Sequence, residues 1–72
     1  MAKRDALIKA RKDKGMTQRD SADAAKISRA FLANIERGEY APSLKVAQAI
    51  ATILERDVEY LFFWQRSAKN AR

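Results

Sequence analysis

Apolar residues recur three and four positions apart along this chain, and no segment alternates apolar with polar residues as a half-buried strand would. Only two glycines and one proline interrupt its 72 residues. Residues that favour helix, among them alanine, leucine, lysine and arginine, dominate the remainder. The pattern predicts an all-α fold.

Local start and stop signals divide the chain into five expected helices. Gly15 ends the first, because glycine readily adopts the left-handed conformation that follows a helix. Thr17 and Asp20 form a capping box at the start of the second, and Ser28 and Ser43 can cap the third and fourth. The expected helices cover about residues 5–14, 18–26, 29–37 and 44–54, and a short last helix follows Asp57.

The composition excludes several classes of function. The chain contains no cysteine and no histidine. It therefore lacks disulfides, the thiolate and imidazole ligands of zinc sites, and the usual proton shuttle of hydrolases. We expect no enzymatic activity, no cofactor, no metal site and no small-molecule ligand.

Length and charge indicate a small basic protein. A chain of 72 residues is one domain, 1–72, and it has no unbroken apolar segment typical of a secretion signal or a membrane span. We expect a cytoplasmic protein without a membrane partner. The net charge is +6, and residues 1–40 carry ten bases against six acids. This excess suits a nucleic-acid partner, although charged residues are also common on surfaces that are merely solvated.

The second and third expected helices, with the short break between them, describe a helix-turn-helix. With Gln18 counted as the first position, small or aliphatic residues fall at the fifth, tenth, fifteenth and eighteenth positions, which are Ala22, Ile27, Leu32 and Ile35. At these positions the two helices must touch. Ala22 must be small so that they can cross closely.

On these residues the chain resembles the Cro and phage-repressor (Xre) family over residues 6–63, and most of all its short single-domain regulators. The matching residues are Gly15-Met16-Thr17-Gln18, Ala22, Ile27-Ser28-Arg29, Ile35-Glu36-Arg37-Gly38, Pro42-Ser43-Leu44, Ile50-Ala51 and Leu61-Phe62. The resemblance implies a compact five-helix, lambda-repressor-like DNA-binding domain with a short basic C-terminal tail, 64–72. Lys26 and Glu55 stand where the family usually has glycine, and each costs about 1 kcal/mol if it adopts the left-handed conformation.

The third helix carries the expected contacts to DNA bases. Its outward residues are expected to be Arg29, Ala30, Ala33 and Asn34. Arg29 can donate two hydrogen bonds to guanine, Asn34 can pair with adenine, and an alanine can touch the methyl group of thymine. The resemblance supports Ser28, Arg29, Ala30 and Asn34 as base contacts. The alternative for Arg29 is a solvated or phosphate-bound side chain.

Other residues are expected to contact the phosphates of the DNA backbone or to stabilise the fold. The resemblance implies that Gln18 contacts phosphate at the start of the second helix, and Lys26, Arg37 and Tyr40 are further phosphate candidates. It also implies a structural ion pair between Arg11 and Glu36.

The aromatic residues near the end of the chain suggest a second copy. Leu61, Phe63 and Trp64 are expected at a dimer interface, because the apolar cluster around them is too large to bury in so small a monomer. The alternative is an aromatic cap over the chain's own first and last helices. Phe31 can stack on a thymine methyl group or pack against the protein, and we favour packing.

These inferences together predict a sequence-specific transcriptional regulator that binds double-stranded DNA. We expect a homodimeric repressor that places its third helix in the major groove of a palindromic operator. A protein-interaction module or an antitoxin with the same fold is the main alternative, and a basic peptide that binds membrane surfaces is a more distant one.

Overall fold

The structure is a computed structural model that describes residues 3–63, except for the side chain of Phe63. Its elements are α1 (Asp5–Asp13), α2 (Gln18–Ala25), α3 (Arg29–Glu36), α4 (Leu44–Leu54) and the short π-helix η1 (Glu59–Phe63). Residues 3–63 contain no strand, so the prediction of an all-α fold is confirmed. Within that range, no helix combines the length and the apolar character that crossing a bilayer requires.

The helix starts follow the predicted capping residues. Thr17 Oγ1 accepts a hydrogen bond from the backbone N–H of Asp20, and Asp20 Oδ2 accepts one from the N–H of Thr17, both over 3.0 Å. Ser28 caps α3 and Ser43 caps α4 in the same way, each through its hydroxyl oxygen. The capping box and both serine caps are confirmed.

All four α-helices end in the same backbone motif, in which a residue with positive φ turns the chain out of the helix. Gly15 and Gly38 fill this position after α1 and α3, with φ of 72° and 81°. Lys26 and Glu55 fill it after α2 and α4, with φ of 62° and 59°. Two residues with side chains thus occupy a conformation that favours glycine, and the local structure is strained at both.

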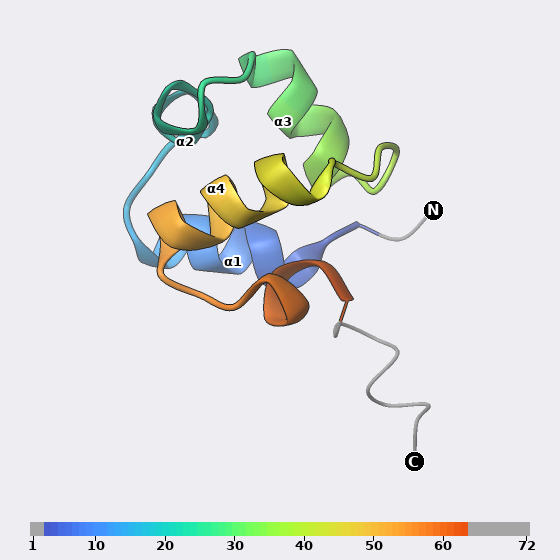
Figure 1. The fold of residues 1–72 in the computed structure, drawn as a ribbon. Coiled ribbons are helices and arrows are strands. Elements are labelled where there is room, and N and C mark those ends of the chain that lie inside the picture. Colours follow the sequence, from blue (N-terminus) through green and yellow to red (C-terminus); the bar gives the residue numbers. More distant parts are fainter. Residues whose placement is uncertain (1–2, 64–72) are drawn as a thin grey trace.

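The helices pack around one apolar core. In Figure 1, α2 and α3 lie on one side of the molecule and α1 and η1 on the other, with α4 between them. α2 contacts α3 and α4, whereas α1 contacts α3 and η1. The buried core residues are Leu7, Ala10, Ala22, Leu32, Ile35, Ala47, Ile50, Ala51, Leu54, Leu61 and Phe62. The core thus draws on every helix.

The last element differs from the expectation in form and in role. We expected an ordinary helix after Asp57, but the segment is a single π turn, η1, which packs against α1. Leu61 is 0% exposed and Phe62 is 8% exposed. The assignment of Leu61 to a dimer interface is therefore corrected, because its side chain lies inside the core, where a second copy cannot reach it. The side chain of Phe63, Trp64 and the tail 64–72 lie outside the described residues.

Arg4, which the sequence did not single out, fastens the start of the chain to the far end of α3. Its N–H donates a hydrogen bond to the carbonyl of Glu36 over 2.8 Å. Its Nη1 donates to the carbonyls of Ile35 and Tyr40, over 2.7 and 2.9 Å. The guanidinium lies 5.6 Å from the centre of the Phe62 ring, and burial lowers the pKa of Arg4. No local sequence signal marks this role, because its partners are distant in the chain.

Candidate nucleic-acid interface

The site begins with the crossing of α2 and α3. Three residues, Lys26, Ile27 and Ser28, connect the two helices. Ala22 is buried where the helices meet, and Leu32 and Ile35 point from α3 into the core. The opposite side of α3 is therefore turned outward, at the edge of the molecule in Figure 1.

Three of the expected base-contacting residues are exposed at the start of α3: Ser28, Arg29 and Ala30. Ser28 is also the N-cap, and its hydroxyl oxygen accepts a hydrogen bond from the N–H of Phe31. Asn34 is half-buried one turn further along the helix. Ala33 was expected to face outward as well, but it is buried, so this expectation is corrected. Ala33 directly follows the buried Leu32 on α3, and only 9% of its surface remains exposed.

Behind this face lies the ion pair that the resemblance implied. Nε of Arg11 lies 2.7 Å from Oε2 of Glu36, and Nη2 lies 3.2 Å from Oε1 of the same carboxylate. The remaining nitrogen of the guanidinium, Nη1, donates to the carbonyl of Met16 over 3.0 Å. Both side chains are buried, so the pair joins α1 rigidly to the end of α3.

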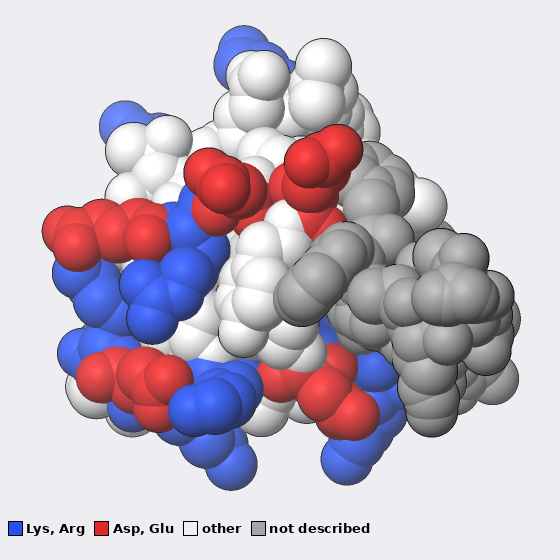
Figure 2. Space-filling model, turned by 90° about the horizontal axis from the view of Figure 1, so that it is seen from below, with Lys and Arg blue, Asp and Glu red and all other residues white. Residues whose placement is uncertain are grey.

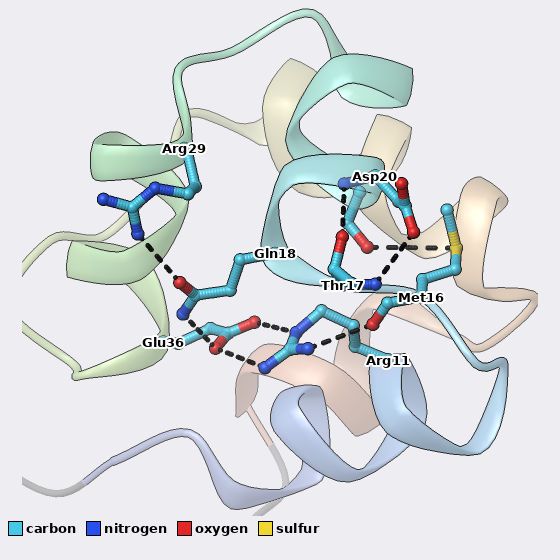
Figure 3. A network of polar contacts seen from close by, with 8 residues as sticks. Arg11, Met16, Thr17, Gln18, Asp20, Arg29 and Glu36 are labelled. Carbon is cyan, nitrogen blue, oxygen red and sulfur yellow. Dashed lines mark hydrogen bonds and ion pairs between the residues drawn. The ribbon is translucent and has the colours of Figure 1, made fainter.

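Gln18 connects this buried pair to the exposed face, as Figure 3 shows. Its Nε2 donates a hydrogen bond to Glu36 Oε1 over 3.0 Å. Its Oε1 accepts one from Nη1 of Arg29 over 3.1 Å. The side chain that was expected to hold a phosphate is thus engaged at both ends by the protein. The sequence did not predict this connection.

The other expected phosphate contacts surround α3. Lys26 is exposed in the turn before α3. Arg37 follows the last turn of α3, where its Nη2 donates to Oδ1 of Asn34 and its Nε donates to Glu39 over 3.4 Å. The ring of Tyr40, a residue that is 53% exposed, lies 5.7 Å from the ring of Phe31. Lys26 thus lies before the start of α3, and Arg37 and Tyr40 lie beyond its end.

Phe31 is half-buried and packs against the apolar core. This confirms packing as its structural role. Its tilted contact with the ring of Tyr40 holds the segment after α3 against the helix.

The arrangement of α2 and α3 defines a helix-turn-helix protein. One side of α3 is buried against the core, and the start of its other side exposes the side chains of Ser28 and Arg29. The Helix-turn-helix family, of the Xre type, matches residues 7–61, and the chain belongs to it.

Named relatives include two proteins of Bacillus phage phi105. The ImmF control region 10 kDa protein is 42% identical over 57 residues, which are 78% of this chain and 63% of that protein. The immunity repressor protein is 48% identical over 44 residues, which are 61% of this chain and 31% of the repressor. The chain thus spans less than two thirds of the length of either relative.

A solved structure has the same fold. The restriction-modification controller protein C.AhdI from Aeromonas hydrophila superposes with a TM-score of 0.73 at 30% sequence identity. The match covers 79% of this chain and 86% of the controller protein.

Proposed function

We propose that this protein is a sequence-specific transcriptional regulator that binds double-stranded DNA and represses by occupying a promoter as a homodimer. The observation that carries the proposal is the division of α3 into two sides. Leu32 and Ile35 are buried, whereas Arg29 and Ala30 are exposed on the helix that follows the turn. An α-helix fits the major groove, where each base pair presents its own pattern of donors and acceptors.

In the proposed complex, side chains of α3 contact the edges of the bases in the major groove. Arg29 donates to O6 and N7 of guanine, and the guanidinium can do so because it extends from the exposed first turn. Ala30 contacts a thymine methyl group, and Ser28 contacts a neighbouring base. Asn34 accepts a hydrogen bond from Arg37 in the free protein, and it gives up this bond to pair with adenine.

The DNA backbone is held on both sides of the groove. Lys26, Arg37 and Tyr40 are placed around α3 for contacts to phosphate oxygens. Gln18 is the first residue of α2, so its backbone N–H has no acceptor within that helix, and the helix dipole at this end favours an anion. Figure 2 shows the face seen from below, on the side of α1 and η1, where the acids and bases of the described residues lie side by side. Among the described residues, this side therefore offers a polyanion no field of one sign.

The repressor role and the dimer draw support from the relatives and from one surface feature. One relative is named as an immunity repressor. Leu44 is 63% exposed and borders a hollow that is also lined by Phe62, so apolar surface remains for a second copy near η1. In this proposal Phe63 and Trp64 contribute to the interface, whereas Leu61 is buried within its own protomer. A symmetric pair predicts a palindromic site with half-sites about 34 Å apart.

Selection of bound duplexes from a random pool tests the proposal. We expect enrichment of sequences with two-fold symmetry, and affinity that falls steeply as salt rises. Arg29→Ala should remove the preference at one guanine position in each half-site, whereas Lys45→Ala, a change on the exposed side of α4, should leave every preference in place. A pool without enriched sequences would overturn the proposal and favour a protein-interaction module with this fold.

A further inference from the structure

We infer that a hollow beside Arg4 is a binding site for a monocarboxylate with a short apolar chain, whose carboxylate pairs with the guanidinium of Arg4. From the sequence we expected no small-molecule ligand. The site departs from that expectation because residues from both ends of the chain form it. It lies apart from the proposed contacts to DNA, so the inference goes beyond the proposed function and does not rest on it.

The hollow has the size and the walls for a small apolar group. Its volume is about 130 Å³, and a cavity of about 150 Å³ can hold benzene, so there is room for a chain of about four carbons. Figure 1 places the starts of α1 and α4 at the same end of the molecule, where the chain before α4 also lies. Apart from Arg4, every lining residue is apolar: Ala41, Pro42, Leu44, Ala47 and Phe62.

The guanidinium of Arg4 keeps donors that the protein does not use. Nη1 donates to the carbonyls of Ile35 and Tyr40. Nε is buried and has no hydrogen-bond partner within residues 3–63, and Nη2 has none there either. These two nitrogens form one edge of the guanidinium, with two parallel donors. A carboxylate that accepts from Nη2 brings its second oxygen to the edge that Nη2 shares with Nε.

The positive charge of Arg4 also lacks a counter-ion. The acceptors of Nη1 are neutral carbonyls, and no carboxylate pairs with Arg4 within residues 3–63. Residues 1–2 and 64–72 contain no Asp or Glu, so they offer no acidic side chain. The guanidinium lies 5.6 Å from the centre of the Phe62 ring, on the apolar side of the hollow. A partly buried cation in such a place favours an anion.

The two features together select the class of ligand. An inorganic anion could pair with Arg4 but would gain nothing from the apolar walls, whereas an uncharged hydrocarbon would leave the cation unpaired. A short monocarboxylate satisfies both. Binding should also tighten the end of α3, because the N–H of Arg4 donates to the carbonyl of Glu36 and its Nη1 holds Ile35 and Tyr40.

An NMR titration of the full chain with butyrate tests the inference. We expect saturable shifts of the Arg4 Nε–H signal and of the backbone amide of Phe62, and a thermal midpoint that rises with butyrate concentration. Butyramide has a similar size without the charge, and formate has the charge without the chain, so each should bind at least about tenfold more weakly. Shifts that do not saturate, or equal affinity for butyrate and butyramide, would overturn the inference.

Two variants test the site from different sides. Arg4→Met removes the cation, and Ala41→Leu fills the hollow from an exposed position and leaves Arg4 in place. Each should lower the affinity for butyrate at least about tenfold. Arg19→Met and Ala24→Leu are the matched controls at exposed positions of α2, and both should bind butyrate as the unmodified protein does. Unchanged affinity in Ala41→Leu, with folding verified by thermal unfolding, would overturn the inference even if Arg4→Met did not fold.

Two further outcomes keep this inference distinct from the proposed function. The hollow borders the surface proposed for a second copy, near Leu44. If a side chain of that copy fills it, the Phe62 signal should follow protein concentration and ignore butyrate, and this result would overturn the inference while it supports the dimer. A failure to enrich any duplex would instead overturn the proposed function and leave saturable butyrate binding in place.

Discussion

Nη1 of Arg29 donates a hydrogen bond to Oε1 of Gln18 over 3.1 Å, across the turn of the helix-turn-helix. The two residues lie eleven positions apart in the chain and belong to different helices. Because Gln18 also binds Glu36, the exposed start of α3 is connected to a carboxylate inside the protein. The proposed DNA-contacting surface and the buried ion pair are therefore connected through one side chain, and single substitutions can test the contribution of each part.

Replacement of one partner of the buried ion pair should destabilise the fold strongly. Arg11→Met leaves Glu36 with a buried charge and without its guanidinium, so we expect the free energy of unfolding to fall by about 3–5 kcal/mol. Urea denaturation followed by circular dichroism measures the change. Lys9→Met is the control, because Lys9 pairs with Asp13 on the surface and its side chain is 69% exposed, so the loss should be about 0.5 kcal/mol or less. A loss as small as this for Arg11→Met would contradict the buried pairing.

Lys26→Gly should stabilise the protein and weaken its binding to DNA. Lys26 has φ of 62°, so glycine relieves strain and we expect a gain of about 1 kcal/mol in the free energy of unfolding. The same change removes one proposed phosphate contact, and the slope of log affinity against log salt should shrink by about 0.9. Thermal unfolding and a salt titration measure the two effects.

Two further glycine variants serve as controls for the backbone argument. Glu55→Gly should gain less than Lys26→Gly, because Glu55 also loses its ion pair with Lys14, 3.1 Å away. Gln48→Gly, at an exposed position in the middle of α4, should lose about 1 kcal/mol, because it places glycine in a helix interior. A destabilised Lys26→Gly protein would refute the assignment of strain at residue 26.

Leu61→Ala should destabilise the single protomer. Its side chain is 0% exposed, and truncation of a buried leucine costs about 2–5 kcal/mol. Leu44→Ala is the matched control, because the same truncation at a residue that is 63% exposed should change the unfolding of the protomer little. Chemical denaturation over a range of protein concentrations measures both. If dilution abolished the effect of Leu61→Ala, Leu61 would be acting between copies after all.

Arg4→Met should loosen the end of α3. The substitution keeps an apolar side chain near Phe62 but removes the hydrogen bonds to the carbonyls of Ile35 and Tyr40, so we expect a loss of about 1–3 kcal/mol. Amide hydrogen exchange in the segment after α3 should quicken. Lys3→Met, at an exposed neighbouring position, should alter neither quantity, and equal exchange in both variants would speak against the role of Arg4.

The helix boundaries were predictable because the signals that produce them act over a few residues. The side chains of Thr17, Ser28 and Ser43 satisfy N–H groups in the first turn of the helix they precede. The form of η1 was less predictable. This segment is a few residues long, and its turn depends on seating both Leu61 and Phe62 in a core that other helices build.

The sequence by itself determined the order of the helices, the helix-turn-helix and the outward position of Arg29, since each follows from neighbours in the chain or from helical periodicity. Only the tertiary structure decided that Gln18 turns toward Glu36, that Arg4 fastens α3, and that Ala33 and Leu61 are covered. Each of these depends on the angle and distance at which separate helices cross. That geometry comes from the packing of the whole core, which no local stretch of residues specifies.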